Sequence, residues 1–218
     1  MPDKRTVLVT GFGPFGDHKI NASWEAVKEL TSLGIQPDIN LVVEEIPVEY
    51  QTVTEIVPAL WQCHQPVLMV HVGVSGIATE LTLEQQAHNG TYDKPDVRFM
   101  IPRNMCCKED GPHHIESRIK MSYICHNINI SECPVKSVVS HNPGRYLCDF
   151  IYYTSLYHIH DKPNQGSAAF IHVPPLGRPY TANQLAQGLK LAIINMLQQS
   201  EGNDNIPECN SWQSIASS

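Results

Sequence analysis

The sequence of 218 residues has no long apolar run and no cluster of basic side chains. Its apolar stretches are far shorter than the roughly 20 residues that a helix needs to cross a bilayer, so no membrane-spanning segment is expected. Lys and Arg number 15 against 22 Asp and Glu, for a formal net charge of -7. The basic residues are scattered and form no run of five or more, which argues against a nucleic-acid-binding surface.

A secretion signal is also lacking. Residues 1–5 lead directly into a strand-like run at 7–10, with no charged segment followed by a long apolar one. We therefore expect a cytoplasmic protein. The seven cysteines agree with this expectation, because an odd number cannot all pair and a cytosolic chain of this size needs no disulfides.

What the sequence does contain is an alternation of apolar strands and amphipathic helices. Strands are expected at residues 7–10, 41–48, 67–72, 79–85, 136–140 and 168–173, and helices at 21–33, about 53–61, 146–158 and from 181 onward. The apolar content of 42% is enough for one sizeable core. Strands that are apolar throughout are typical of a covered parallel sheet. We predict a single α/β domain whose mostly parallel, twisted sheet is flanked by helices on both faces.

The folded domain should comprise residues 1–200, since no internal repeat or linker divides the chain. Residues 201–218 are polar and aperiodic and should form a disordered tail. Residues 89–114 are rich in Gly, Pro, Asp and Asn, so we expect mostly loop there, with one short strand near Phe99.

Helix ends carry local signals. Asn21 is expected to cap the first helix, and Gly34 to end it. Pro58 should kink the second helix. Thr181 and Gln184 have the spacing of a capping box, which predicts the start of the last helix.

A glycine-rich turn, GFGPFG at residues 11–16, follows the first strand and matches the pattern of dinucleotide-binding enzymes. In those enzymes the helix begins within the motif and meets the pyrophosphate. Here Pro14 and Phe15 interrupt the motif, and a polar run precedes any helix. A tight turn that directs Phe12 and Phe15 toward an apolar ligand is the better interpretation.

Cys148 is a candidate nucleophile because of its position. It follows a strand and a turn built on Asn142-Pro143-Gly144, and it precedes a helix. The start of a helix carries free N–H groups and a positive partial charge, which favour a thiolate and could hold an oxyanion. The alternative is an ordinary buried cysteine, a common environment for a free thiol.

Two histidines are candidates for a base. His172 lies near the end of an apolar strand that Pro174 and Pro175 terminate, and His71 has a similar setting. Ligands of open α/β sheets bind outside the carboxyl ends of the strands. Spacing alone does not choose between the two, and either could be a satisfied core histidine. Glu84, on the polar side of its strand, would by default be solvated.

A metal site is not expected. Cys106-Cys107 and His113-His114 bring together residue types that bind metals. Adjacent cysteines, however, lack the C-x2–4-C spacing of structural zinc sites.

Several segments together resemble one enzyme family. They are VTGFGPFG at 9–16, NASWE at 21–25, IPVEY at 46–50, HVGVSG at 71–76, LE at 83–84, GRYLC at 144–148 and FIHVP at 170–174. In this order they are similar to the pyroglutamyl-peptidase I family of cysteine peptidases, in its animal form. The likeness extends from about Val7 to Leu197.

The resemblance implies a cytoplasmic, monomeric enzyme that hydrolyses the amide bond after an N-terminal pyroglutamate of peptides. It implies no metal and no organic cofactor, and an architecture shared with nucleoside phosphorylases. It places the nucleophile at Cys148, the base at His172 and the orienting acid at Glu84, which decides between the histidines. It further implies an apolar pocket for the pyroglutamyl ring. That pocket would be formed by Phe12, Phe15, Asn21, Tyr146 and Leu147.

Two positions depart from the family pattern. Prokaryotic members usually have arginine directly after the glutamate, where this chain has Gln85, so the second donor of the oxyanion hole is left open. Pro143 stands where the family tends to have alanine, and proline fixes φ and lacks an N–H. Two rival functions fit the same fold: a nucleoside phosphorylase-like enzyme in which Cys148 has no role, and a degenerate relative that binds peptide ends without cleaving them.

Overall fold

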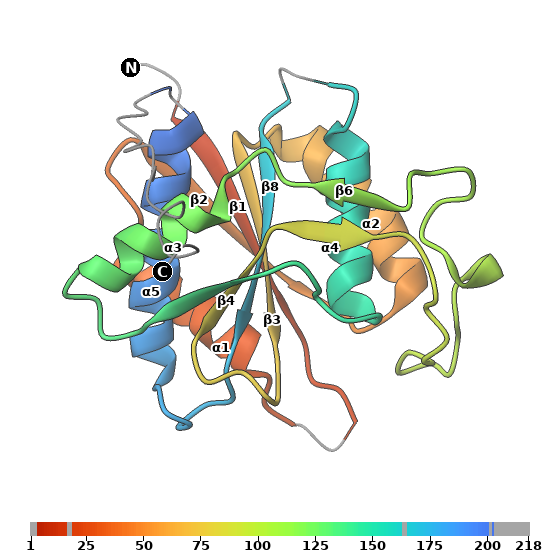
Figure 1. The fold of residues 1–218 in the computed structure, drawn as a ribbon, viewed down its shortest axis with the longest axis horizontal. Helices are drawn as coiled ribbons and strands as arrows, with labels where there is room; N and C mark the ends of the chain where they lie inside the picture. Colours follow the sequence, from red (N-terminus) through yellow and green to blue (C-terminus); the bar gives the residue numbers. More distant parts are fainter. Residues whose placement is uncertain (1–3, 17–18, 163–164, 201, 203–218) are drawn as a thin grey trace, which may run out of the picture.

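The computed structural model describes residues 4–16, 19–162, 165–200 and 202. Apart from Gly202, the predicted tail at 201–218 lies outside these residues. A six-stranded sheet runs through the middle of the molecule (Figure 1). In sheet order its strands are β2 (Ile39–Ile46), β1 (Arg5–Phe12), β3 (Leu68–Val74), β8 (Ser167–Val173), β4 (Leu81–Glu84) and β7 (Ser137–Ser140).

The direction of the strands changes once. Strands β2, β1, β3 and β8 are parallel neighbours, β4 is antiparallel to β8, and β7 is parallel to β4. The prediction of a mostly parallel sheet is confirmed. The antiparallel junction was not predicted, and it sets the C-terminal end of β4 beside the middle of β8, where Glu84 pairs with Phe170.

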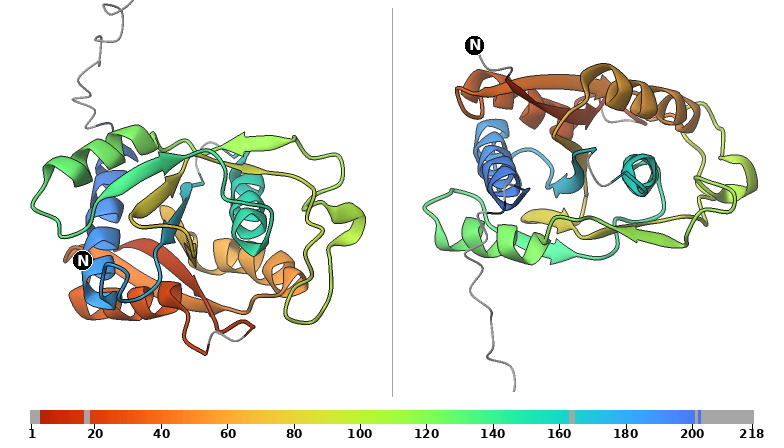
Figure 2. Two further views of the ribbon diagram at one scale, coloured as in Figure 1. Left: turned by 60° about the horizontal axis from the view of Figure 1, so that its bottom comes forward. Right: turned by 90° about the horizontal axis from the view of Figure 1, so that it is seen from above.

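Helices cover both faces of the sheet, as predicted. One face packs on α1 (Ala22–Leu33), α3 (Met121–Ile130) and α5 (Ala182–Ser200), and the other on α2 (Tyr50–His64) and α4 (Leu147–Ile159). Figures 1 and 2 show the two groups on opposite sides of the strands. Among the described residues, no helix has the length and apolar character to cross a membrane.

A small two-stranded sheet lies beside α4. It pairs β5 (Gln86–His88) with β6 (His114–Glu116) in antiparallel register, and a single 3-10 turn, Arg103–Met105, interrupts the loop between them. The strand expected near Phe99 is wrong. Phe99 has a φ of 61° and is 88% exposed, and a positive φ does not fit an extended strand.

The predicted helix ends are confirmed. The Asn21 side chain accepts a hydrogen bond from the Ser23 amide at 3.1 Å, and Gly34 ends α1 with a φ of 57°. Thr181 and Gln184 form the reciprocal bonds of a capping box. Helix α2 continues through Pro58 to His64, so the expected kink does not divide it.

The glycine-rich turn packs tightly but lacks the dinucleotide-binding geometry. Helix α1 begins only at Ala22, well after Gly16, so its N-terminus is not part of the motif. A Cβ atom on Gly11 would lie 2.8 Å from the Trp24 Cα atom, which is closer than side chains tolerate. Gly11 therefore permits the close approach of β1 and α1.

Candidate active site

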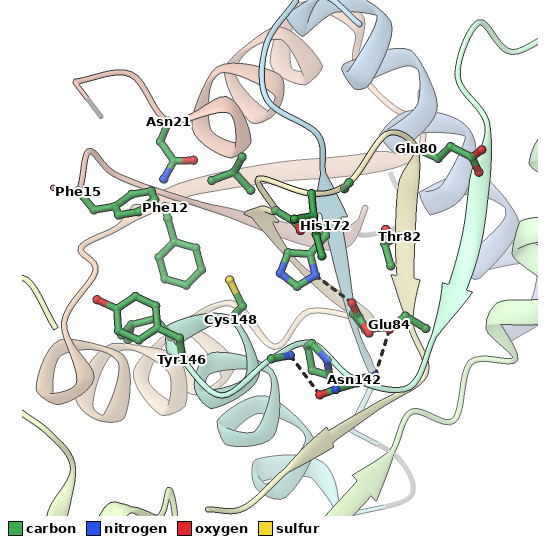
Figure 3. A pocket seen from close by; sticks show the side chains of 18 of the residues that line it. Phe12, Phe15, Asn21, Glu80, Thr82, Glu84, Asn142, Tyr146, Cys148 and His172 are labelled. Carbon is green, nitrogen blue, oxygen red and sulfur yellow. Dashed lines mark hydrogen bonds and ion pairs between the residues drawn. The ribbon is translucent and has the colours of Figure 1, made fainter. Parts of the chain in front are cut away.

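A pocket of about 770 Å³ opens where β1, β3 and β8 end (Figure 3). It lies at the carboxyl ends of the parallel strands, the usual place for a ligand in such a sheet. All the site residues predicted from the sequence line it, namely Phe12, Phe15, Asn21, Glu84, Tyr146, Leu147, Cys148 and His172. Residues from both halves of the chain thus meet in one cavity.

Cys148 is the second residue of α4 and is half-buried. Tyr146, with extended backbone, precedes the helix, and its carbonyl accepts the first intrahelical bond from Phe150 N at 3.0 Å. The amide hydrogens of residues 147–149 precede that bond and have no partner within the helix. They are the donors that a negative charge near Cys148 would meet.

His172 lies on β8 and faces Cys148 in the pocket (Figure 3). Its Nδ1 atom is 2.9 Å from Oε1 of Glu84, and its ring packs against the edge of Phe170 at a centroid distance of 4.7 Å. Only 7% of the residue is exposed. The ring is therefore held on both sides, with Nε2 left for chemistry.

The charge of His172 depends on two anions. Burial alone lowers its pKa, because it disfavours the charged ring. A negative Cys148 sulfur and the hydrogen bonds and charge of Glu84 outweigh burial and raise the pKa to about 10. The arrangement therefore favours a charged His172 imidazolium beside the Cys148 sulfur at neutral pH.

Glu84 is the last residue of β4 and is only 1% exposed, so it is not the solvated acid that its strand position suggests. The Tyr152 hydroxyl donates to its backbone carbonyl at 2.9 Å. Its Oε2 atom is buried and has no hydrogen-bond partner among the described residues. The hydrogen bond to His172 is thus the main polar interaction of this carboxylate.

One end of the pocket is aromatic. Phe12 ends β1, and Phe15 follows in the glycine-rich turn. Asn21 fixes this turn to α1, because its Nδ2 donates to the Gly13 carbonyl at 2.9 Å while its Oδ1 caps the helix. Tyr146 lies across from the two phenylalanines, and its hydroxyl donates to the Pro95 carbonyl at 3.1 Å (Figure 3). Flat apolar groups of small size fit such a wall.

A family model described as pyroglutamyl peptidase matches residues 5–196. The chain belongs to the pyroglutamyl peptidase family. It is 51% identical to human pyroglutamyl-peptidase 1 over 205 residues, which cover 93% of this chain and 96% of the human protein. It is 50% identical to the rat protein of the same name over 202 residues, or 91% of this chain and 94% of that protein. A pyrrolidone carboxyl peptidase structure from Fervidobacterium islandicum matches with a TM-score of 0.80 and 27% identity, covering 90% of this chain and 99% of the other.

For a pyroglutamyl peptidase family member, Gln85 is the notable departure after the acid. Its Nε2 atom donates to the carbonyls of Ser117 and Ile119, at 3.1 and 3.0 Å, and its Oε1 accepts from Met121 N at 2.9 Å. It does not line the pocket. Gln85 therefore fixes the segment before α3 to the end of β4, and its amide is not available to an oxyanion.

His71, the other candidate base, lies outside the pocket. It is fully buried between the Thr10 and Ser155 hydroxyls, at 2.7 and 2.6 Å, and burial lowers its pKa to about 3. It is a neutral core histidine. The family resemblance pointed to His172, which lines the pocket together with Cys148.

Other charged residues of the pocket were not singled out from the sequence. Lys94 and Glu80 also line it, and the Lys94 ammonium lies 4.5 Å from the centroid of the Tyr146 ring. Both belong to segments without a motif, so their place became visible only in the fold. Within the described ranges, no three His, Cys, Asp or Glu side chains gather in a way that could hold a metal ion.

Proposed function

We propose that this chain hydrolyses the amide bond after an N-terminal pyroglutamate and does so through a thioester on Cys148. The observation that carries the proposal is the pocket itself. It holds Cys148, His172 and Glu84 in series beside an aromatic wall. Human pyroglutamyl-peptidase 1, half identical over nearly its whole length, supports the same activity by its name.

In the first half-reaction, the Cys148 thiolate attacks the pyroglutamyl carbonyl carbon and forms the S–C bond. The carbonyl electrons move to oxygen and return as the C–N bond breaks. His172 gives its proton to the departing amine nitrogen. In the second half-reaction, His172 takes a proton from water, and the hydroxide displaces the sulfur to release pyroglutamate. Glu84 keeps Nε2 of His172 pointed at the sulfur and offsets the imidazolium charge.

The start of α4 supplies the donors for the oxyanion. With Gln85 held away from the pocket, the backbone N–H groups at residues 147–149 are the groups best placed to accept the developing charge. An arginine after the acid is therefore not needed. The flanking Pro143 lies before this helix, so its missing N–H removes none of these donors.

The aromatic end of the pocket suits an uncharged lactam ring. Phe12, Phe15 and Tyr146 offer ring faces and no negative charge, so a free N-terminal ammonium packed against these three rings would lose its hydration without gaining an anionic partner from them. The substrates are peptides that begin with pyroglutamate. We place the enzyme in the cytoplasm as a monomer, as the resemblance to the animal form of the family implies.

Hydrolysis of a pyroglutamyl aminomethylcoumarin amide tests the proposal. Cys148→Ser should fold normally and lose about three or more orders of magnitude in kcat, because a hydroxyl is far less ionised than a thiol. Cys106→Ser and Cys107→Ser serve as controls and should keep most of their activity. Near-normal turnover of Cys148→Ser would refute the assignment. Phosphorolysis of a nucleoside by the same protein would instead favour the phosphorylase-like rival.

A further inference from the structure

A buried carboxylate adjoins the nucleophile and has no role in the reaction described above. Asp149 follows Cys148 in the first turn of α4 and is fully buried. It does not line the pocket. A buried carboxylate is costly unless donors surround it, so its contacts show what it is held for.

Most contacts of Asp149 reach the chain that follows Glu84. Its Oδ1 accepts the backbone N–H of His88 at 2.9 Å and lies 3.5 Å from the His88 Nδ1 atom. Its Oδ2 lies 3.4 Å from an Arg145 guanidinium nitrogen. The Tyr92 hydroxyl, which donates its proton to the His88 carbonyl, also lies close to the carboxylate. Two of these three partners belong to the chain that follows Glu84.

His88 is well placed to be the connecting residue. It ends β5, the strand that follows Glu84 after the single residue Gln85. Tyr92 reinforces the connection, because its hydroxyl donates to the His88 carbonyl. The Asp149 carboxylate therefore fixes the start of the nucleophile's helix to the strand immediately beyond the acid.

The hydrogen bonds of His88 indicate which of its nitrogens carries the proton. The Gln86 amide nitrogen donates to the His141 carbonyl at 3.1 Å and contacts His88 Nε2 at 3.1 Å. Nε2 is therefore the acceptor and Nδ1 bears the hydrogen. Nδ1 is buried and has no hydrogen-bond partner among the described residues, and it lies 3.5 Å from Oδ1 of Asp149.

Opposing effects act on the pKa of the Asp149 carboxyl group. Burial raises its pKa to about 7, although the His88 N–H, the Arg145 charge and the Tyr92 hydroxyl act to lower it. The titratable or charged groups around it come from α4 and from every segment packed against it: Glu84, His88, Tyr92, Cys107, Arg145 and Tyr152. The carboxyl group can thus gain or lose its proton near neutral pH.

We propose that Asp149 is a positioning residue of the reaction. By fixing the start of α4 to β5, it keeps Cys148 aligned with His172 and Glu84. The inference rests on the proposed function, since it needs Cys148 to be the nucleophile. Small displacements of reacting groups lower kcat strongly. The aromatic wall has no contact with Asp149 among the hydrogen bonds and ion pairs above, so substrate binding should be spared.

Two substitutions separate the contact from the charge. Asp149→Asn keeps an oxygen for the His88 N–H but loses the ion pair with Arg145, whereas Asp149→Ala loses both. With a pyroglutamyl aminomethylcoumarin amide at pH 8, we expect kcat to fall about threefold in Asp149→Asn and at least about tenfold in Asp149→Ala. KM should stay within about twofold of wild type in both.

A pH profile distinguishes positioning with charge coupling from a purely structural role. Protonation of Asp149 weakens its ion pair with Arg145. Ionisation of Asp149 adds a negative charge, besides that of Glu84, near the Cys148 sulfur. Asp149→Asn removes both effects. The acid limb of the kcat/KM profile should therefore move to lower pH in this variant. A limb at the wild-type pH, or at higher pH, would overturn the proposal.

Ser155→Ala is the matched control. Ser155 is buried on the same helix two turns further on, and it contacts His71 and Trp61 instead of the segment after Glu84. This variant should lower the melting temperature but keep kcat within about twofold. If it lowers kcat as much as Asp149→Ala at a similar loss of stability, Asp149 has no special role. If Asp149→Ala fails to fold, the Asp149→Asn profile decides.

Cys148→Ser in the same series keeps the two proposals apart. Activity in Cys148→Ser would refute the proposed function. Inactivity of Cys148→Ser together with wild-type kcat and wild-type pH profiles for both Asp149 variants would refute only the positioning role.

Discussion

Gly73 of β3 lies directly against the Cys148 thiol. A Cβ atom at residue 73 would come within 2.8 Å of the Cys148 sulfur and 2.7 Å of Cζ in the Phe170 ring. Both distances are below those that carbon contacts tolerate, so only glycine leaves room for the sulfur where it is. The backbone of β3 thus packs directly against the nucleophile.

Gly73→Ala should therefore damage catalysis as well as packing. The added methyl group must push the sulfur or the Phe170 ring aside, and overpacking of this kind costs about 1–3 kcal/mol of stability. We expect kcat to fall at least about tenfold, because the thiol leaves its line with His172. Gly76→Ala, where a Cβ atom meets nothing within 4 Å, is the control. Equal kcat values for the two variants would contradict this account.

The roles of Glu84 and His172 predict different severities. His172 transfers protons in both half-reactions, so His172→Ala should be nearly inactive. Glu84 only orients and stabilises the ring, so Glu84→Gln should retain measurable hydrolysis with a large loss in kcat. Stopped assays over long incubation times with each variant measure the difference. Equal residual rates would show that the two residues do not act in series.

The pH profile of Glu84→Gln should shift in a defined direction. The Glu84 anion helps to raise the pKa of His172 to about 10, and the neutral amide no longer does so. The imidazolium then loses its proton at lower pH. The alkaline limb of kcat/KM should therefore move to lower pH. An unmoved limb with unchanged kcat would place Glu84 outside the machinery.

Substrate choice tests the aromatic pocket. Peptides that begin with pyroglutamate should be cleaved, and the same peptides with uncyclised Gln or Glu should not, because their ammonium would be buried without a partner. Paired assays on one peptide sequence with the three N-termini give the answer by mass spectrometry. Similar rates for the pyroglutamyl and glutaminyl peptides would rule out the lactam pocket.

Asn21→Asp should separate the helix cap from the pocket. An aspartate keeps the oxygen that caps α1, and a negative charge suits a helix N-terminus, so stability should change by less than about 1 kcal/mol. Its second oxygen, however, faces the Gly13 carbonyl in place of a donor. We expect KM to rise severalfold as the turn that carries Phe15 shifts. Asn183→Asp, exposed near the start of α5, should leave KM unchanged.

Local signals in the sequence were sufficient for most of the fold. Asn21, Gly34 and the Thr181–Gln184 pair set helix ends through bonds within a few residues, so their prediction needs no knowledge of the rest of the chain. Helix α3 was missed although Met121, Ile124 and Ile128 are spaced along one buried face. Its N-cap residue, Lys120, has no capping side chain, and packing against α5 stabilises it instead.

The site residues show where sequence patterns stop being informative. The alternation at β4 put Glu84 on the polar side, but its burial comes from Tyr152 and His172, which lie far along the chain. The same holds for Asp149, whose partner His88 is 61 residues away. Family likeness could indicate Cys148 and His172, since short motifs surround them. Neither motif nor periodicity could indicate a carboxylate whose only role is to join two segments.

The central strand of the sheet is also the last one to be synthesised. Strand β8 lies between β3 and β4, and it alone joins the β2-β1-β3 group to the β4-β7 pair. Until it leaves the ribosome, the nascent chain carries Cys148 without its base and has two partial sheets with open edges. Proteolytic competence must therefore arise late in translation. A chain truncated before residue 167 would therefore be inactive. Its exposed strand edges would make it prone to aggregate and to bind chaperones.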